Sequence, residues 1–439
     1  MRVYMKRLIL IVIVCGLLWI IMPYSQRIEI PSMSKSSDLQ NMEKRIDILK
    51  LELSNQMDKS KVLLEKVAEL KEALDSKRVN LKGKGDGKTL DTARNLVLPI
   101  LVIACDRVTV SRCLENLVKY RPDKRMFPII VSQDCGHNAT YRVIKSFTDS
   151  DPSITVVRQP DQSAIALPKT KVKFAGYYKI ARHFKFALDH VLHTLGHDAV
   201  IIVEDDLDIS QDFYEYFLGT YPLLLEDDSL WCISAWNDNG KRDVIDLSAP
   251  ELLHRTDFFP GLGWMIMRHT WTKLAEEWPP AFFDDWLRNP MNTDGKACIR
   301  PEISRTHTFG KIGVSKGLFY ENHLKSMHLN TKYVEFTKLD LSYLLKKFYD
   351  PALEETVSSL PVTTADQLEA MPRGSDAVKL TYSNARSFQH QARVLGLMDD
   401  FRSGVPRTAY RGIVTCMYRG RRVYLVPSFP WEKYDPSWG

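Results

Sequence analysis

Four short apolar runs in the middle of the chain constrain its fold more than any other feature. Each run is free of charged residues, which is the pattern of a strand buried on both faces of a parallel sheet. Segments with helical spacing separate the runs, among them 110–120 and 177–193. The runs themselves are 98–104, 127–131, 154–157 and 199–203. This alternation predicts an α/β domain built on a mostly parallel sheet.

Polar side chains follow three of these runs directly. Parallel strands end at the same edge of a sheet, and ligands of open α/β sheets bind outside that edge, so these side chains are candidate site residues. They are Asp106, Arg107, Gln133, Asp134, Glu204, Asp205 and Asp206.

The acidic triplet Glu204, Asp205 and Asp206 is the strongest of these signals. Adjacent carboxylates repel one another, and a divalent cation relieves the repulsion. Oxygen ligands favour Mn²⁺ or Mg²⁺, and such an ion would bridge a diphosphate and stabilise the charge on a departing nucleotide. A solvated acidic turn is the alternative. The position at the end of the fourth apolar run favours a metal-dependent nucleotide-sugar site.

The N-terminus predicts a membrane anchor. Residues 8–22 are almost uniformly apolar and follow three basic residues, which hold that end of a membrane segment in the cytosol. A cleaved signal peptide would end in small residues, whereas 19–23 reads WIIMP. We therefore expect a cytosolic tail over 1–7, a transmembrane signal anchor over 8–24 and a luminal remainder.

Residues 25–95 are typical of a stem. The stretch is charged, and its apolar residues recur in heptad-like steps that are interrupted at Gln56 and Ser60. The pattern predicts a partly formed coiled coil that dimerises the protein, or an amphipathic helix that only holds the rest of the chain off the membrane. The Gly- and Lys-rich tract 82–88 predicts a flexible linker before the globular part.

Composition and cysteine usage narrow the class of protein. The net charge of +6 is small for 439 residues, and no dense basic stripe with interleaved aromatic residues is present, so we expect no nucleic-acid partner. The seven cysteines lack the CxxC or Cys/His spacing of a zinc site. In an oxidising lumen, disulfides are therefore favoured over a structural metal.

Several long strings of this sequence resemble the N-acetylglucosaminyltransferase I family, in the same order and over roughly residues 97–439. They are 99–107 (PILVIACDR), 127–137 (FPIIVSQDCGH), 176–183 (GYYKIARH), 203–207 (VEDDL), 234–240 (SAWNDNG), 255–264 (RTDFFPGLGW), 300–306 (RPEISRT), 339–343 (LDLSY) and 403–407 (SGVPR).

This resemblance implies a GT-A nucleotide-sugar-binding fold and an inverting, Mn²⁺-dependent glycosyl transfer. It assigns Asp206 as the metal ligand. The residues that it assigns to the donor UDP-GlcNAc are Arg107, Asp134, His183, Glu204 and Asp205.

The resemblance also implies a catalytic base and a loop that closes over the donor. The base is Asp284, and we expect the neighbouring Asp285 to point away, so that only one of the two can serve. The Gly-rich loop 308–318 is expected to order when the donor binds, with Ser315 touching the diphosphate. An ordinary connector between domains is the alternative for this loop.

Two disulfides follow from the same resemblance, Cys105 with Cys135 and Cys232 with Cys298. Cys113 and Cys416 are then expected to be buried free thiols. The expected domains are a GT-A catalytic domain over 96–310, a linker with the donor-closing loop over 311–346, and a small α+β domain over 347–439. In the last of these, strand-like runs lie at 378–382, 412–418 and 421–426, and helical spacing lies at 387–397.

The activity implied is transfer of N-acetylglucosamine in β-1,2 linkage to the α-1,3-linked mannose of the Man5GlcNAc2 N-glycan. The implied location is the Golgi membrane, with a single pass, type II topology and a luminal catalytic part. Two alternatives stay open at this point. One is a transferase that acts on O-linked mannose, which would carry a folded stem domain, and the other is a non-catalytic Golgi glycan-binding protein, which would lack the triplet or the base.

Overall fold

The computed structural model describes residues 44–47, 50, 54, 61, 96–311, 313, 317, 320–321 and 323–438. The chain divides into two compact units, Met1–Ala93 and Arg94–Gly439. In the first unit the described residues are helical. The predicted anchor over 8–24 lies outside the described residues. Within the described part of the chain, no helix is both long and apolar enough to cross a membrane.

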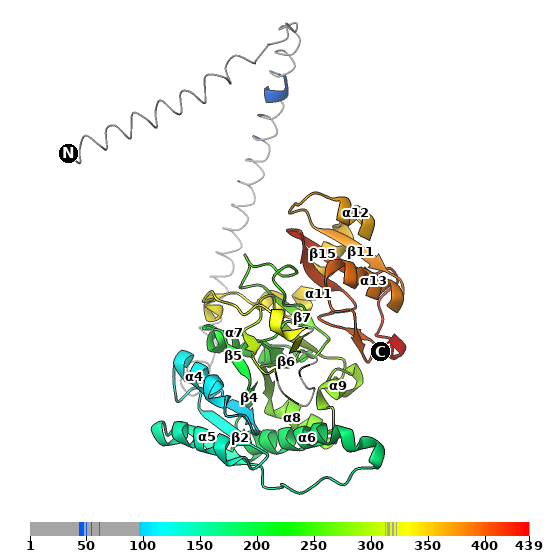
Figure 1. Ribbon diagram of the computed structural model, residues 1–439. Coiled ribbons are helices and arrows are strands. Elements are labelled where there is room, and N and C mark those ends of the chain that lie inside the picture. The colour runs from blue at the N-terminus through cyan, green and yellow to red at the C-terminus, as the bar shows by residue number, and fades with distance from the viewer. Residues whose placement is uncertain are drawn as a thin grey trace, which may run out of the picture. The chain divides into compact units, whose positions relative to one another are not determined.

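An eight-stranded sheet forms the centre of the second unit, in the order β3-β2-β1-β4-β8-β6-β9-β7 (Figure 1). The neighbours β3, β2, β1 and β4 pair in parallel, as do β6 and β9, whereas β8 and β7 run antiparallel to their neighbours. The strands are β1 Ile100–Ala104, β2 Ile129–Gln133, β3 Ile154–Arg158, β4 Ala199–Glu204, β6 Leu230–Ser234, β7 Leu253–Thr256, β8 Trp264–Met267 and β9 Ala297–Pro301. The four apolar runs are β1 to β4, so the prediction of a mostly parallel sheet is confirmed.

Helices cover both faces of this sheet because its strands are apolar on both sides. In β1, Ile100, Val102 and Ala104 pack into one hydrophobic core, and the alternating Leu101 and Ile103 pack into the other. The first core is closed by α4 (Val110–Tyr120), α5 (Asn138–Ser150) and α7 (Phe213–Glu226). The second is closed by α6 (Ala175–Leu188), the π-helical turn Asp189–Thr194 and α8 (Arg268–Glu276).

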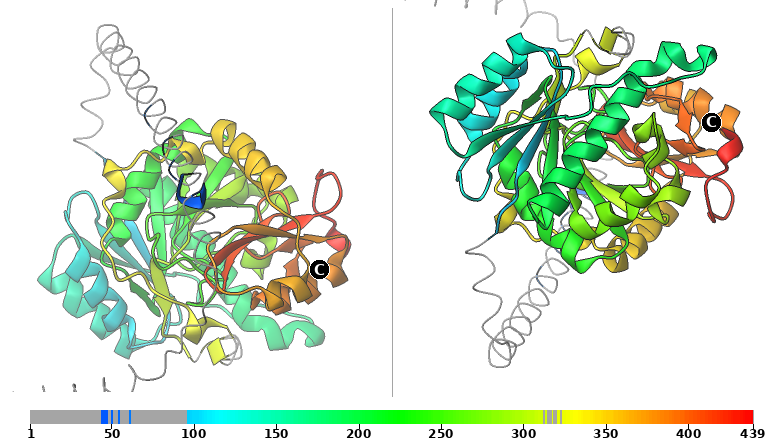
Figure 2. Two further views of the ribbon diagram at one scale, coloured as in Figure 1. Left: turned by 90° about the horizontal axis from the view of Figure 1, so that it is seen from above. Right: turned by 90° about the horizontal axis from the view of Figure 1, so that it is seen from below.

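The C-terminal part of the chain has its own sheet and core. Strands β11 (Val378–Tyr382), β15 (Arg421–Pro427) and β14 (Val414–Tyr418) form a sheet in that order. These orange and red elements lie together on one side of the second unit (Figure 2). Helix α13 (Ala385–Leu395) buries one face on this sheet's core and ends at Gly396, whose φ of 76° suits a left-handed helix cap. The strands and helix that the sequence predicts here are therefore present.

Further helices and strands complete the second unit. They are β5 (Leu207–Ile209), α9 (Phe283–Leu287), β10 (Thr306–Thr308), α11 (Lys346–Ser359), α12 (Ala365–Ala370), β12 (Phe401–Arg402) and β13 (Val405–Pro406).

Two disulfides connect neighbouring strands of the large sheet or the turns that follow them. Cys105 bonds to Cys135 across the turns after β1 and β2, with 5.2 Å between their Cα atoms. Cys232 of β6 bonds to Cys298 of β9, its partner in the strand register. Cys113 and Cys416 are buried free thiols. Both disulfide pairings and both free thiols agree with the sequence predictions.

Candidate active site

The carboxyl ends of β1, β2 and β4 lie side by side. In the parallel register, Ile103 of β1 pairs with Glu204 of β4, and Ala104 pairs with Gln133 of β2. The turns after these strands therefore share one edge of the sheet. They carry Arg107, Asp134, Glu204, Asp205 and Asp206.

Arg107 ties the acidic triplet to the turn after β1. Its Nη1 lies 3.0 Å from Oδ1 of Asp205 and also donates to Oδ2 of Asp206. The backbone N–H of Cys105 donates to the other carboxylate oxygen of Asp205, at 3.2 Å. The backbone carbonyl of Asp206 accepts from the N–H of Phe309, at 2.9 Å. The structure thus brings together three of the residues that the sequence predicts for the donor and the metal.

The triplet holds more negative charge than its one cationic neighbour balances. Burial, together with the negative charges of Asp206 and Asp205, raises the pKa of Glu204 to about 8. Burial also raises the pKa of Asp205 to about 7, against the lowering effect of Arg107. Because the cause is loss of solvation combined with like charge, a bound cation would stabilise the ionised form of this cluster.

Asp134 and His183 form a second, more enclosed group beside the triplet. Asp134 follows β2, is 5% exposed and accepts a hydrogen bond from Nε2 of Gln162 at 2.8 Å. His183 lies on α6, and its Nε2 is 2.8 Å from Oγ of Ser132. Burial lowers the pKa of His183 to about 4, while Asp134 opposes the shift, so the imidazole is neutral at neutral pH. Neither side chain lines the cavity described next.

A cavity of about 370 Å³ contains both Glu204 and Asp284 in its wall. Asp284 enters it from α9, which starts after Phe282, a residue with a left-handed φ of 53°. The ring of Phe282 stacks on Tyr177, with centroids 4.5 Å apart, and packs edge-on against Phe174. These aromatic contacts hold the unusual backbone and so fix the direction in which α9 presents Asp284.

Asp284 and Asp285 converge, so the expectation that they point apart is wrong. Nη1 of Arg288 lies 3.1 Å from Oδ2 of Asp284 and 3.0 Å from Oδ1 of Asp285. The physical reason is helix spacing, because residues three and four before an arginine share its face. The two carboxylates still differ, since Asp285 also forms an ion pair with Nε of Arg402 at 3.2 Å.

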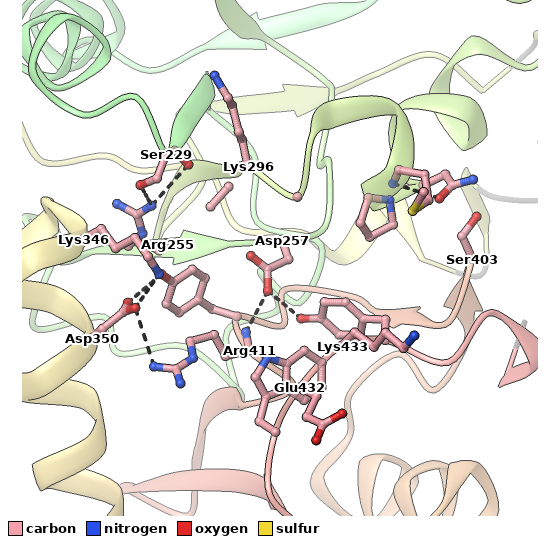
Figure 3. Close-up of a pocket in the computed structure, with 18 of the residues that line it drawn as sticks. Ser229, Arg255, Asp257, Lys296, Lys346, Asp350, Ser403, Arg411, Glu432 and Lys433 are labelled. Atoms are coloured by element: carbon pink, nitrogen blue, oxygen red, sulfur yellow. Dashed lines mark hydrogen bonds and ion pairs between the residues drawn. The ribbon is translucent and has the colours of Figure 1, made fainter.

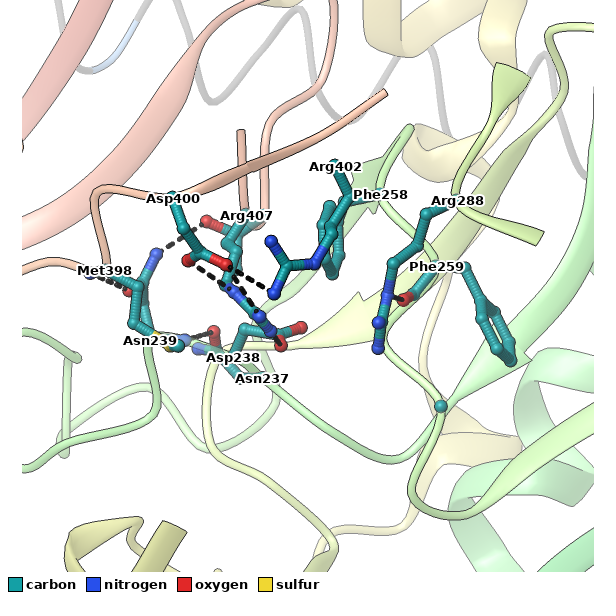
Figure 4. A network of polar contacts seen from close by, with 12 residues as sticks. Asn237, Asp238, Asn239, Phe258, Phe259, Arg288, Met398, Asp400, Arg402 and Arg407 are labelled. Carbon is teal, nitrogen blue, oxygen red and sulfur yellow. Dashed lines mark hydrogen bonds and ion pairs between the residues drawn. The ribbon is translucent and has the colours of Figure 1, made fainter. Parts of the chain in front are cut away.

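Four charged residues of this cavity were missed by the sequence interpretation. Asp238, Arg288, Arg402 and Arg407 line it together with Asp284, and Arg407 bonds to Asp238 at 2.6 Å (Figure 4). Asp238 and Arg407 lie in strings that carry the family resemblance, which was the available signal. Their pairing joins positions 169 residues apart, which no local pattern reveals.

The Gly-rich loop after β10 reaches the acidic triplet. A Cβ on Gly310 would lie 1.9 Å from Oδ2 of Asp206, and a Cβ on Gly313 would lie 2.9 Å from Nη2 of Arg107. Glycine is therefore required at 310 for the backbone to approach the carboxylate so closely. Ser315, which was assigned to the diphosphate, lies outside the described residues.

A larger cavity of the second unit, about 780 Å³, has a different set of lining residues (Figure 3). Some of its charged groups pair with one another, as Arg411 does with Glu354 and Asp350. None of the residues that the sequence assigns to donor, metal or base lines it. The cavity of about 370 Å³ is therefore the candidate active site.

Known proteins resemble this chain over most of its length. The model of the GNT-I family matches residues 5–438. The α-1,3-mannosyl-glycoprotein 2-β-N-acetylglucosaminyltransferase of Arabidopsis thaliana is 34% identical over 369 residues, which cover 82% of this chain and 82% of that protein.

Solved structures resemble this chain only distantly. TarS of S. aureus in complex with UDP-GlcNAc is 12% identical, with a TM-score of 0.30 over 68% of this chain and 72% of that one. A mannosyltransferase of Pyrobaculum calidifontis in complex with GDP-Man and Mn²⁺ is 14% identical, with a TM-score of 0.30 over 46% and 54%. We draw no conclusion about this chain from similarity at this level. The match to the family model over almost the whole length, together with the plant relative, shows that the chain belongs to the GNT-I family.

Proposed function

We propose that this protein transfers N-acetylglucosamine from UDP-GlcNAc, in β-1,2 linkage, to the α-1,3-linked mannose of an N-glycan. Membership of the GNT-I family supports the reaction, because the match spans residues 5–438. The observation that supports the location is the shared cavity, whose wall contains both Asp284 and Glu204 of the acidic triplet. Five-mannose N-glycan is the acceptor of this proposal.

The donor occupies the edge of the sheet where β1, β2 and β4 end. Arg107 is already aimed at the acidic triplet, and its guanidinium is suited to a diphosphate by its planar set of donors. Asp134 and neutral His183 hold the nucleoside, which suits their enclosed position. Glu204 and Asp205 face the sugar and the diphosphate, and Ser315 contacts the phosphates from the loop.

Mn²⁺ is the cofactor of this proposal, and the residues present fit it. The donors are carboxylate oxygens, which a hard divalent cation prefers. Within the described part of the chain, no cluster of three or more His, Cys, Asp or Glu side chains could hold a metal. That fits an ion that takes one protein carboxylate, Asp206, and completes its shell with diphosphate and water. When bound, the ion neutralises the charge that develops on the leaving UDP.

Asp284 is the base. Of the two neighbouring carboxylates, Asp285 is engaged by both Arg288 and Arg402, whereas Asp284 is engaged by Arg288 alone. Asp284 lines the same cavity as Glu204, and its charge contributes to the raised pKa of Glu204, which supports a role near the donor. It is therefore the carboxylate that is free to accept a proton.

The reaction of this proposal is a single displacement. The mannose 2-hydroxyl attacks the anomeric carbon, a new C–O bond forms as the bond to the UDP oxygen breaks, and the configuration inverts. The hydroxyl proton passes to a carboxylate oxygen of Asp284, and general-base help of this kind contributes about 10²- to 10⁴-fold in rate. Arg288 donates to that carboxylate at 3.1 Å and so fixes its position.

The proposal also assigns a role to each of the other segments of the chain. We propose a cytosolic tail over 1–7, a Golgi membrane anchor over 8–24, a helical stem over 25–95 that pairs with a second copy, a catalytic domain over 96–310, a donor-closing linker over 311–346 and a C-terminal domain over 347–439. The two disulfides support a luminal site, because disulfides persist in oxidising compartments.

A transfer assay tests this function. The full chain is incubated with UDP-GlcNAc and either Man5GlcNAc2 or an O-mannosyl peptide, with Mn²⁺ or with EDTA, and the product linkage is read by NMR. The proposal requires one β-1,2-linked residue on the N-glycan and no transfer in EDTA. Transfer to the O-mannosyl peptide alone, or full activity in EDTA, contradicts it.

A further inference from the structure

The loop after β6 carries a buried carboxylate with an unmet hydrogen bond. Asp238 is 4% exposed and lines the candidate active-site cavity. Its Oδ1 accepts from Nη1 of Arg407 at 2.6 Å. Its Oδ2 is buried, and among the residues that the structure describes it has no hydrogen-bond partner. An unsatisfied buried polar atom is costly, so its presence in a cavity wall points to a ligand.

The neighbours of Asp238 keep this oxygen free. Arg407 is held at its other edge by Asp400, with Nε and Nη2 at 2.7 and 2.9 Å from the two carboxylate oxygens (Figure 4). This two-pronged pairing fixes the guanidinium, so it cannot turn to Oδ2. The loop itself is pinned by Asn237, which donates to the carbonyl of Glu302 at 2.7 Å, and by Asn239, which donates to Thr408 at 3.0 Å.

Asp238 is connected to the base through two arginines. The guanidinium of Arg407, which bonds to Asp238, lies 5.1 Å from the ring centroid of Phe258. The guanidinium of Arg288, which bonds to Asp284, lies 5.0 Å from the same centroid. Because the base contacts the acceptor hydroxyl in a displacement, a carboxylate joined to it in this way is suited to the acceptor side of the cavity.

A second polar atom without a partner faces the same cavity. His323 lines it, and its buried Nδ1 has no hydrogen-bond partner within the described residues. The side chain is partly buried, and burial lowers its pKa, as do Lys241 and Arg407, so the imidazole is neutral and offers one donor and one acceptor.

The chemistry of this end of the cavity suits a neutral sugar. Each nearby cation is already engaged by carboxylates, Arg288 by Asp284 and Asp285 and Arg407 by Asp238 and Asp400. An anionic ligand would therefore find no free positive charge among these groups. A hydroxyl group, in contrast, can donate to Oδ2 of Asp238, and the same sugar can bond to His323.

We propose that Asp238, held by Arg407, and His323 form the subsite that binds hydroxyl groups of the acceptor mannose. This inference rests on the proposed transferase function. A pyranose of the donor offers the same hydroxyl chemistry, so the test must separate the two sugars.

Kinetics of Asp238→Asn in the full chain make that separation. Asparagine keeps the oxygen that accepts from Arg407 and loses the charged acceptor. We expect kcat/KM for the mannose acceptor to fall about 10- to 100-fold, the range for a hydrogen bond to a charged group. The KM for UDP-GlcNAc and the rate of donor hydrolysis without acceptor stay unchanged. Asp149→Asn, which removes an exposed pair with Lys145 on α5, is the control substitution of the same type and keeps wild-type kinetics.

Acceptors that lack single hydroxyl groups give the decisive readout. On wild type, one monodeoxy mannoside loses most of its kcat/KM, and on Asp238→Asn that analogue and its parent react equally. In His323→Ala no hydrogen bond of Nδ1 to a described residue is lost. This variant shows the same pattern for a hydroxyl of the same sugar. An equal loss on every analogue makes Asp238 merely structural, and a changed donor KM or hydrolysis rate assigns it to the donor sugar. Either result overturns the inference, whereas a wild type that transfers to no mannoside overturns the proposed function instead.

Discussion

At the residue scale, the close approach of Gly310 to Asp206 makes activity most sensitive to substitution. In Gly310→Ala the added Cβ would meet Oδ2 of Asp206 at 1.9 Å, so either the loop or the carboxylate must move. We expect transfer activity to fall by at least about 100-fold, as for a misplacement of about 1 Å at a reacting centre. In Gly313→Ala the nearest atom is the flexible tip of Arg107 at 2.9 Å, and the loss should stay below about tenfold. Equal activities of the two variants, measured with unchanged melting temperatures, would refute this account.

Individual site residues were predictable from the sequence where they follow a strand. Arg107, Asp134 and the triplet lie at strand ends, and strand ends meet at one edge of a parallel sheet. The convergence of Asp284 and Asp285 follows from helix spacing around Arg288, and it was missed because the short helix α9 was not predicted from the sequence. The unmet oxygen of Asp238 depends on Arg407, far along the chain, and so lies beyond any local pattern.

At the scale of elements, we expect both disulfides to stabilise the fold but only one to affect donor binding. Closing a loop of 66 residues, as Cys232 and Cys298 do, is worth about 4 kcal/mol in the chain-entropy account, and the 30-residue loop of Cys105 and Cys135 is worth slightly less. Replacing either pair by serine should lower the melting temperature. Only loss of Cys105 and Cys135 should also raise the KM for UDP-GlcNAc, because that bond joins the turns of Arg107 and Asp134. A donor KM that rises equally in both variants is the contradicting result.

Half of the large sheet was visible in the sequence and half was not. Strands β1 to β4 are continuous apolar runs, because helices cover both of their faces. Strand β7 is as buried as these but reads Leu-His-Arg-Thr. Its polar side chains bond to remote partners, Arg255 to Asp227 at 2.9 Å and His254 to Glu302 at 2.8 Å. A strand whose polarity is balanced only in the folded state carries no apolar signal.

At the scale of the whole molecule, a buried ionic cluster joins the large sheet to the C-terminal sheet. Glu302 follows β9, bonds to His254 at 2.8 Å and forms an ion pair with Arg422 of β15 at 2.9 Å. Hydrogen bonding and charge hold the pKa of Glu302 well below its usual range, and burial lowers the pKa of His254 to about 4. The cluster therefore favours an ionised Glu302 and a neutral His254.

These shifts predict loss of stability in acid. Both pKa values are lower in the folded chain than in the unfolded one, so their contribution is complete above about pH 6.5, the ordinary pKa of histidine, and is lost as the pH falls toward 4. For His254 the shift corresponds to about 3 kcal/mol. The melting temperature should fall over this window, and less steeply in His254→Gln, which cannot take up the proton. Identical slopes for the two proteins would show that His254 is not the titrating group.

The fold of the second unit was largely predictable, since the apolar runs and the C-terminal strands each carry a local signal. What the sequence could not supply is the meeting of distant segments, such as α9, the loop of Asp238 and the strands β12 and β13, around one cavity. That meeting depends on packing between elements and on charges that pair only after folding.

The central claim is that Asp284 acts as the base in this cavity, and the matched pair Asp284→Asn and Asp285→Asn tests it most directly. Both substitutions remove one carboxylate beside Arg288, and Asp285→Asn also removes a pair with Arg402, so a general effect of lost charge would be larger in Asp285→Asn. With UDP-GlcNAc, Mn²⁺ and Man5GlcNAc2, the account predicts a fall in kcat of about 10²- to 10⁴-fold for Asp284→Asn and of less than about tenfold for Asp285→Asn. A larger loss in Asp285→Asn, or near-normal turnover by Asp284→Asn, would contradict it.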